Sequence, residues 1–287
     1  MKRKHFSYLL GIALVFGLWS CQNEDAAETS VKNAEDEAVA EALFAQTISE
    51  ADNLGDFTAL FGDEPGNIAV DNTTPPAITP PVTSGTRVVT VTPQTGFPRT
   101  VTIVFTNWKV GEQREKNGTI RIVHTGPMHR IGTTRTMTYE NFSIGGNKIE
   151  GTKVITNVDG LNLSVSLTGG KITFLDGTTI TRTVTRNREW IAGMNTPRFI
   201  WDDEYRITGT VSGVNRAERP YSVQITKPLI RRMACLWIVE GIVLMTNGDR
   251  NVILDYGTGT CDDLATVTAN GETREITLPR TPPRRRP

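Results

Sequence analysis

Apolar and polar residues alternate along most of the chain from residue 86 onward. The stretch 161–168 (LNLSVSLT) alternates without a break, and Val101, Ile103 and Phe105 alternate with Thr100, Thr102 and Val104. A period of two places successive side chains on opposite faces of a strand. One face of the predicted sheet is therefore buried and the other is wet.

Glycine-containing turn signals separate the alternating stretches. Asn-Gly and Asp-Gly favour the type I′ hairpin turn, which pairs consecutive strands antiparallel. The spacing predicts a mainly β protein: a long antiparallel β-meander over 86–279, with roughly ten to thirteen strands, as an open curved sheet or a sandwich. The signals are Asn117-Gly118, Gly145-Gly146-Asn147, Asp159-Gly160, Gly169-Gly170, Asp176-Gly177, Asn247-Gly248-Asp249 and Asn270-Gly271.

The stretch 233–245 differs because nearly every residue in it is apolar, and Arg231 and Arg232 end it on the N-terminal side. Such a run predicts either a strand that is buried on both faces or the place where another layer covers the sheet. The cover is expected to be a second sheet or an N-terminal helix.

A helical pattern precedes the sheet. In the acidic segment 33–61, Val39, Leu43 and Phe44 fall near helical spacing, Asn33 suits an N-cap and Gly55 follows the end. We expect one short helix that packs on the sheet or serves as a spacer. The segment 62–85 is a proline-rich linker.

Charge is distributed unevenly although the whole chain is neutral. Residues 22–64 hold twelve acids and one base (net −11), whereas 65–287 hold 27 bases and 19 acids (net +8). The acidic leader and the basic body are expected to attract each other or to face different partners. No dense basic stripe interleaved with aromatic residues is present, so nucleic acid is not an expected partner.

The first twenty residues predict a signal peptide. A basic start (residues 2–4) precedes an apolar run over 8–18, and Leu18-Trp19-Ser20-Cys21 follows. This pattern resembles a bacterial lipoprotein precursor. The resemblance implies that 1–20 is removed, that Cys21 carries lipid and joins the protein to a membrane, and that 21–32 is a tether.

The acids that follow Cys21 narrow the resemblance. Glu24 and Asp25 are similar to the acidic export tag of Bacteroidetes-type surface lipoproteins, and 255–267 followed by Asn270-Gly271 resembles a recurring closing segment of such chains. The resemblance implies the outer membrane, at the cell surface. It implies no activity and no cofactor.

Cys235 and Cys261 are the remaining cysteines. An even pair in an exported chain predicts a disulfide, worth about 3 kcal/mol in the chain-entropy model; two buried free thiols are the alternative. No Cys or His lies near either in sequence, so a metal site is not predicted there.

A group of arginines is a candidate for ligand binding. Arg182 and Arg186 share one strand face, and Arg188 and Trp190 follow on the same side. These side chains are expected either to grip an anion or to cover the outer face of the sheet with their stems.

Two smaller groups of polar residues are further candidates. Trp201 and Tyr205 flank three acids (202–204), as at a sugar or calcium site or at a solvated strand start. His124 and His129 are expected to flank a turn, as surface residues or, less expectedly, as metal ligands.

The chain carries no sequence signature of catalysis: it lacks a Gly-x-Ser-x-Gly elbow, a His-Glu-x-x-His helix and a phosphate-binding glycine loop. We therefore expect a binding or adhesion module for a glycan or lipopolysaccharide. The alternatives are a structural, fimbrial-like envelope protein and a hydrolase acting through carboxylates. The basic tail 280–287 could contact the acidic leader or lipopolysaccharide.

Overall fold

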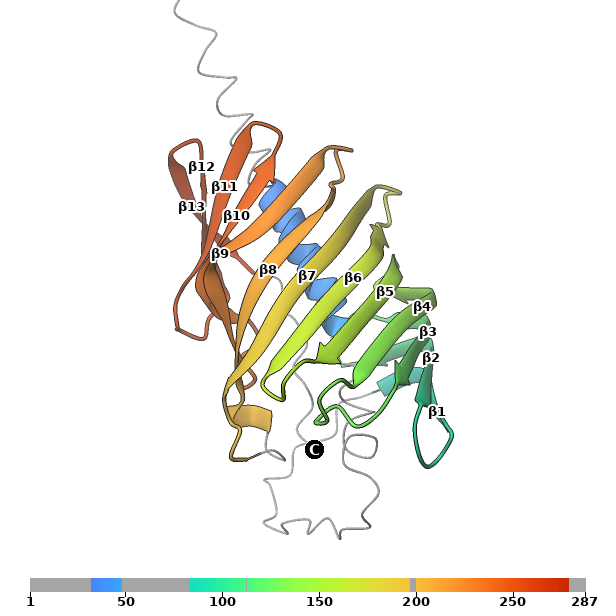
Figure 1. The fold of residues 1–287 in the computed structure, drawn as a ribbon. Helices are drawn as coiled ribbons and strands as arrows, with labels where there is room; N and C mark the ends of the chain where they lie inside the picture. Colours follow the sequence, from blue (N-terminus) through green and yellow to red (C-terminus); the bar gives the residue numbers. More distant parts are fainter. Residues whose placement is uncertain (1–31, 48–82, 112, 197–199, 279–287) are drawn as a thin grey trace, which may run out of the picture.

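The computed structural model describes residues 32–47, 83–111, 113–196 and 200–278. Thirteen strands form one antiparallel sheet in which the spatial order follows the sequence from β1 to β13 (Figure 1). The predicted β-meander is confirmed as an open sheet. Its elements are β1 (Thr83–Thr92), β2 (Arg99–Val110), β3 (Lys116–His124), β4 (Thr134–Ile144), β5 (Asn147–Asn157), β6 (Asn162–Thr173), β7 (Thr179–Ala192), the 3₁₀ turn η1 (Ile200–Asp202), β8 (Glu204–Val214), β9 (Pro220–Arg232), β10 (Ile238–Asn247), β11 (Arg250–Thr258), β12 (Leu264–Ala269) and β13 (Glu272–Thr277).

Strand register produces a continuous apolar row across one face. In-register partners join twelve strands, and every member of the row is apolar except Lys153: Val91, Val101, Ile122, Met137, Lys153, Leu167, Val184, Val211, Val223, Met245, Val252 and Ala269. The positions one residue away carry Thr136, Ser166, Thr185, Thr210 and Gln224 on the other face. The period of two therefore separates a buried face from a wet one.

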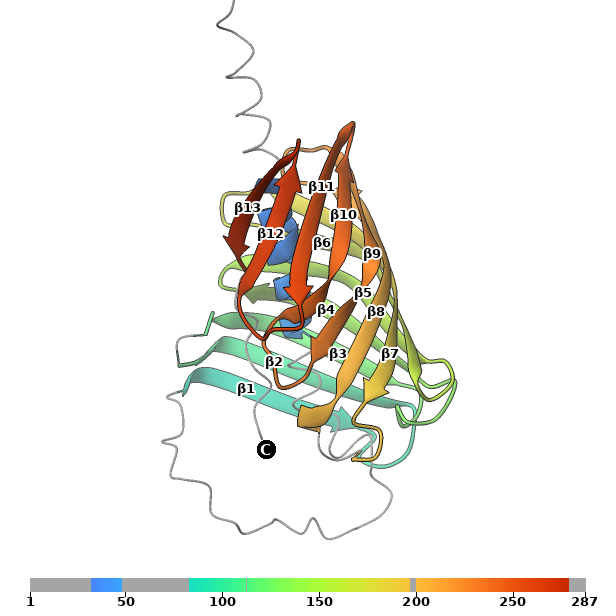
Figure 2. The ribbon, with the colours of Figure 1, turned by 90° about the vertical axis from the view of Figure 1, so that its left-hand side faces the viewer.

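The sheet curls around the helix 32–47. The helix lies in a trough on the apolar, concave face, with β1–β5 on one side and β10–β13 on the other (Figure 2). Ala34, Ala40, Leu43 and Phe44 belong to the same buried cluster as the apolar row. The predicted helix is thus confirmed and covers the sheet from within. It is too short and too polar to cross a membrane, and the described residues contain no other helix that could.

Two predicted turn signals lie inside strands. The strand register shifts between Asn117 and Thr119 in β3 and between Leu167 and Gly170 in β6. Gly118 and Gly169 therefore lie in β-bulges. Gly118 and Gly169 have positive φ, which suits a bulge as well as a hairpin. The other predicted turn signals lie between strands or at their ends.

The apolar run 233–245 is not one strand buried on both faces. Met233 to Trp237 form a turn, and β10 begins at Ile238 with alternating burial. Met233 and Cys235 are buried in this turn, and Cys235 is joined to Cys261 by a disulfide with a Cα–Cα distance of 5.8 Å. The predicted cysteine pair is therefore confirmed.

The boundaries of the sheet differ slightly from the prediction. The sheet starts at Thr83, within the range predicted as linker. Cys21, the acidic tag, 48–82 and the tail 280–287 lie outside the described residues.

Candidate functional site

The concave face carries arginines at one end. Alternation along β7 places Arg182, Arg186, Arg188 and Trp190 on this face, so the shared face of Arg182 and Arg186 is confirmed. They do not cover the outer face of the sheet, which was one of the two expectations. In β8, Gly209 is in register with Arg186. A Cβ at Gly209 would lie 2.7 Å from the Arg186 Cα, so glycine permits this close approach of the two strands.

Two of these arginines hold the helix through carboxylates. Arg182 Nη2 donates to Glu37 Oε1 at 2.9 Å and to Glu41 Oε2 at 2.8 Å, while Arg186 Nη1 donates to Glu41 Oε1 at 2.6 Å. The Arg182 side chain is only 1% exposed. The acidic leader and the basic body therefore attract each other within one molecule.

A third arginine holds the start of the helix. Arg216, in the β8–β9 turn, forms an ion pair with Asp36 at 3.1 Å and donates from Nε to Thr178 Oγ1 at 2.8 Å. Its guanidinium also lies 4.4 Å from the centroid of the Phe174 ring. The same arginine thus joins the helix to the turn between β6 and β7.

Apolar and aromatic contacts surround the ion pairs of Arg182. Its guanidinium lies 5.6 Å from the centroid of the Phe44 ring, which meets Tyr139 edge-on at 6.4 Å. Tyr139 Oη and Thr47 Oγ1 are hydrogen-bonded at 2.8 Å. Charge-assisted bonds in a buried site are strong, but burying the charges carries a large desolvation cost.

Burial and charge set the ionisation of the acids on the helix. Burial raises the pKa of Glu41, but Arg186 and Arg182 outweigh it and hold that pKa well below its ordinary value. For Glu37 burial dominates, so its pKa is raised despite Arg182. Burial also lowers the pKa of Lys153 to about 7, with Glu41 opposing the change. Glu41 is thus the firmly ionised partner of this group.

A second group lies at the end of the concave face near the β7–β8 connection. Arg188 is 3.5 Å from the centroid of the Tyr205 ring, and Tyr205 stacks on Trp190 at 6.3 Å. Arg231 is in register with Tyr205 from β9. Within the described residues, neither Arg188 nor Arg231 has an ion pair with a carboxylate. Burial lowers the pKa of Arg231 to about 10, and the charge of Arg188 adds to this effect. We call Arg188, Trp190, Tyr205 and Arg231 the open arginine site.

Asp203 lies beside the aromatic pair of this site. Its carboxylate accepts hydrogen bonds from Trp190 Nε1 at 3.2 Å and from Tyr205 Oη at 2.9 Å. Burial raises its pKa to about 6, although both hydrogen bonds and Arg188 lower it. The carboxylate therefore fixes the orientation of the aromatic rings and titrates in a mildly acidic range.

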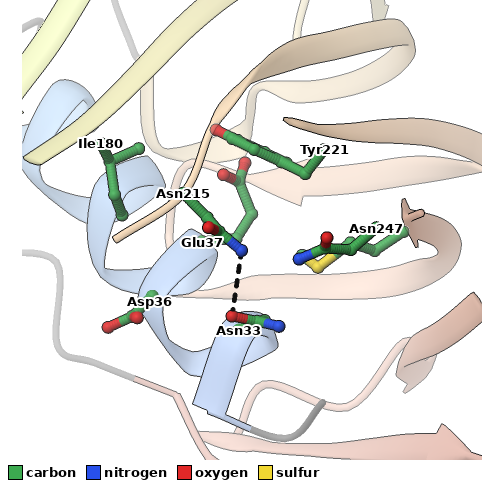
Figure 3. Close-up of a pocket in the computed structure, with 8 residues that line it drawn as sticks. Asn33, Asp36, Glu37, Ile180, Asn215, Tyr221 and Asn247 are labelled. Atoms are coloured by element: carbon green, nitrogen blue, oxygen red, sulfur yellow. Dashed lines mark hydrogen bonds between the residues drawn. The ribbon is translucent and has the colours of Figure 1, made fainter. Parts of the chain in front are cut away.

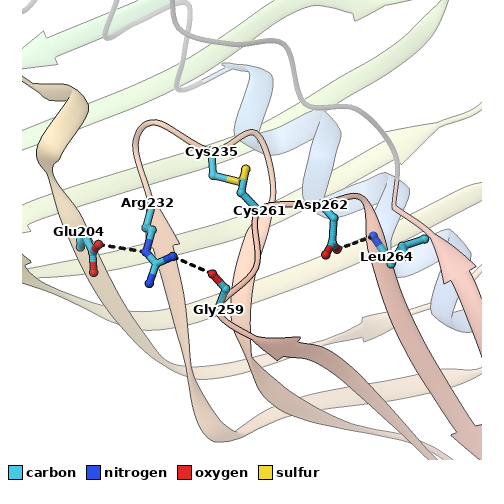
Figure 4. Close-up of a disulfide and its surroundings, with 7 residues drawn as sticks. All are labelled: Glu204, Arg232, Cys235, Gly259, Cys261, Asp262 and Leu264. Carbon is cyan, nitrogen blue, oxygen red and sulfur yellow. Dashed lines mark hydrogen bonds and ion pairs between the residues drawn. A yellow bond between two sulfur atoms is a disulfide. The ribbon is translucent and has the colours of Figure 1, made fainter.

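The disulfide turn forms one wall of the open arginine site. Arg188 Nη2 contacts Met233 Sδ at 3.8 Å, and the Met233 N–H donates to the Asp203 carbonyl at 2.9 Å. Arg232 ties this wall to Glu204 at 3.0 Å and to the Gly259 carbonyl at 2.7 Å (Figure 4). The staple between Cys235 and Cys261 therefore holds the wall in place.

Further basic side chains occupy the same end of the trough on β2 to β4. Arg99, His124 and Arg135 are in-register neighbours, and the row continues through β5 and β6 to Arg186. Burial, together with Arg135 and Arg99, lowers the pKa of His124 to about 3. His124 is therefore a neutral, buried residue rather than the expected surface residue, while His129 is exposed.

The opposite end of the concave face is mainly apolar, although Lys116, in register with Ile144, is also buried there. Ile149, Ile172 and Ile180 are in register and buried, and the rings of Phe105 and Phe142 lie 5.7 Å apart. The two ends of the trough therefore differ in composition: arginines prevail at one, and aliphatic and aromatic side chains at the other, where Lys116 and Arg216 are charged exceptions.

A shallow pocket lies beside the helix start, between Asn33, Glu37, Tyr221 and Asn247 (Figure 3). Asn215 Nδ2 donates to Asn33 Oδ1 at 3.2 Å across it. This pocket is a seam where the helix meets β9 and β10.

The remaining predicted residues take separate roles. Trp201 lies half-buried in η1. Asp202 accepts a bond from Thr196 and Glu204 pairs with Arg232, so the three acids at 202–204 face different partners. No cluster of three or more potential metal ligands occurs among the described residues.

Sequence reasoning missed Lys153, Arg231 and the role of the helix acids. The signal for Lys153 was its place on the buried phase of β5, between Ile149 and Ile155. No comparable signal marks the helix acids, because their partners lie on strands that are distant in sequence.

Comparison with known proteins adds no assignment: no family model, no curated protein and no solved structure matches the chain.

Proposed function

We propose that this protein is a lipid-anchored, non-catalytic binding module at the outer-membrane surface, and that it takes an anionic glycan or lipopolysaccharide at the open arginine site. The anchor rests on the lipoprotein pattern that ends at Cys21, and the surface location rests on Glu24 and Asp25. The basic body of the chain favours an anionic partner.

The pair Arg188 and Arg231 carries the proposal. Arg188 lies over the Tyr205 ring of the stacked Trp190–Tyr205 pair, Arg231 is in register with Tyr205 and is affected by the charge of Arg188, and neither has a carboxylate ion pair among the described residues. Neighbouring cations cost energy in the free protein, and an anion would relieve that cost. Arginine binds phosphate and carboxylate groups bidentately, and aromatic rings pack against the faces of sugars and guanidinium groups.

Binding to immobilised lipopolysaccharide tests the ligand. We expect the full lipidated chain, in neutral detergent, to bind intact lipopolysaccharide and to lose about tenfold in affinity when Arg188 or Arg231 is changed to Ala, since each loses a charge-assisted bond. Arg206→Ala is the matched control, because Arg206 follows Tyr205 in β8, faces the other side and pairs with Glu189. Equal binding to dephosphorylated lipopolysaccharide, or an equal loss in Arg206→Ala, would contradict the proposal.

Protease shaving of intact cells tests the location. We expect the wild-type protein to be cleaved from the cell surface and Cys21→Ala to lose its anchoring. If cleavage occurs only after the envelope is opened, the protein faces the periplasm and the surface proposal fails.

An assembly role is the second candidate, favoured by one observation. β1 is an edge strand that is exposed along most of its length, with Val88 56% exposed and its in-register neighbour Val104 40% exposed. An exposed edge strand is a template for strand addition. β13 carries Glu272, Arg274 and Glu275, which discourage pairing at the other edge. A concentration-dependent oligomer that Val88→Lys abolishes would support assembly through β1.

The third expectation, a hydrolase acting through carboxylates, has less support. Asp203 has the raised pKa that an acid catalyst needs, but its carboxylate is bonded to Trp190 and Tyr205. Its neighbours Asp202 and Glu204 bond elsewhere. A binding role accounts for this arrangement more simply.

A further inference from the structure

We propose that the helix 32–47 is an exchangeable occupant of the trough, and that the trough binds an anionic amphiphile, a molecule with an extended apolar chain and a phosphate or carboxylate head. This inference rests on the proposed function and names the class of ligand for the same concave face. The head would meet the arginines and the chain would lie along the apolar row.

The lining of the trough is basic at one end and, apart from the buried Lys116, mainly apolar at the other. In β7, Ile180 faces the apolar end, while Arg186 and Arg188 face the basic end. The same change occurs on β2 to β4, where buried Ile103 and Phe105 give way to Arg99, His124 and Arg135. A protein core needs no charged end, whereas a site for a molecule with a charged head and an apolar tail needs both.

The helix presents the same two chemistries to the trough. Glu37 and Glu41 supply carboxylates to Arg182 and Arg186, and Leu43 and Phe44 fill apolar space. Its carboxylates thus stand where the head of an amphiphile would lie. Figure 2 shows the helix lying inside the curl of the sheet.

The helix satisfies the basic groups only in part. Arg182 uses Nη2 alone for both acids, and within the part of the chain that the structure describes, its Nε and Nη1 and Arg186 Nε are buried without a hydrogen-bond partner. Buried polar groups are normally hydrogen-bonded, and unmade bonds are costly. An alkyl phosphate presents three terminal oxygens around one tetrahedral centre, so a single head group could meet donors that the two planar carboxylates leave unbonded.

The contacts that hold the helix are suited to exchange. Much of its buried surface is small, with Ala34, Ala38, Ala40 and Ala42 among its buried residues. Among the described residues, no backbone hydrogen bond joins the helix to a strand. Because β1 and β13 do not pair with each other, the helix can leave without breaking a strand ladder.

Thiol labelling of Ala42→Cys in the full chain tests the exchange. Ala42 is buried, Cys235 and Cys261 are already joined, and Cys21→Ala in the same chain leaves the introduced thiol as the one to be labelled. With dodecyl phosphate as the probe, we expect alkylation of the introduced thiol to accelerate about tenfold. Inorganic phosphate and the uncharged dodecyl maltoside are the two controls, and neither is expected to accelerate it. If inorganic phosphate acts equally, the site takes a free anion and the amphiphile proposal fails.

Two further variants separate helix release from misfolding. Phe44→Ala weakens the apolar hold without touching a charge, and Glu37→Gln with Glu41→Gln removes the charges; each should lower the dodecyl phosphate concentration needed for labelling. Glu189→Gln, an acid on the outer face, should leave it unchanged. An unchanged labelling rate with dodecyl phosphate bound would overturn the exchange. If, in that case, the Arg188→Ala variant no longer binds dodecyl phosphate, the proposed function stands and only the exchange of the helix is refuted.

Discussion

Two arginine groups on the same face of β7 have opposite environments. Arg182 and Arg186 are matched by Glu37 and Glu41 of the chain itself, whereas Arg188, with Arg231 beside it, meets an aromatic pair. Residue type and strand phase place a cation on a face, but the partner that it meets there decides its role. A matched cation contributes to folding, whereas an unmatched one is available to a ligand without displacing any part of the chain.

Breaking the ion pairs of Arg182 and Arg186 with Glu37 and Glu41, which we call the matched group, should have the largest effect on stability. Arg182→Ala leaves the buried Glu37 carboxylate without its partner, and we expect the free energy of unfolding to fall by roughly 3–5 kcal/mol. Urea denaturation measures this loss. Adding Glu37→Gln should restore part of it, because the uncompensated charge is then removed. A loss below about 1 kcal/mol would show that the ion pairs are not important for stability.

The disulfide supports the wall of the open arginine site. Replacing both Cys235 and Cys261 by Ala should cost about 3 kcal/mol in the chain-entropy model. We expect faster amide exchange in the wall, at Met233 and Gly259, than at Arg182. Uniform loss of protection across the sheet would instead mean that the staple supports the whole fold.

Lys153 is the charged exception in the apolar row, close to the matched group. Its folded pKa of about 7 lies below its ordinary value of 10.5, so the stability present above that value is lost as the pH falls towards 7. Lys153→Met should therefore stabilise the protein by about 1–2 kcal/mol at pH 6 and less at pH 10. Lys148→Met, at an exposed position, is the control. Thermal melts at both pH values provide the comparison.

Asp203 makes the open arginine site sensitive to pH. Its folded pKa of about 6 exceeds its ordinary value, so the stability it contributes is full below pH 4 and is lost as the pH rises through 6. We expect a contribution of about 1 kcal/mol, because the neighbouring Trp190 and Tyr205 are partly exposed and solvent weakens the effect. Asp203→Asn should flatten the pH dependence of stability between 4 and 6. An unchanged slope would assign that dependence to other groups.

The weakest effect on stability should belong to the unmatched cation. Arg188→Ala removes repulsion with Arg231 as well as contact with Tyr205, so we expect less than about 0.5 kcal/mol of change in unfolding free energy. Urea denaturation beside Arg182→Ala measures the contrast directly. A loss as large as that of Arg182→Ala would mean that Arg188 is a structural residue.

Much of the fold could be predicted because it depends on local rules. Alternation at 161–168 and the Gly-containing turns give a meander in sequence order, since consecutive strands joined by short turns pair with each other. The same rules wrongly predicted hairpin turns at Gly118 and Gly169, because a glycine with positive φ is found in a β-bulge as readily as in a turn. They also failed at 233–237, where a turn that buries Met233 and Cys235 is as apolar as a strand.

Local pattern and residue type were enough to specify the sheet, the helix, the shared face of Arg182 and Arg186 and the cysteine pair. The position of the helix inside the curled sheet, with Glu41 against Arg182 141 positions away, became apparent only in the folded molecule. Periodicity reports which face of an element is buried, but not against which element. Partners so distant in sequence are chosen by curvature, register and charge together, and these exist only once the chain has folded.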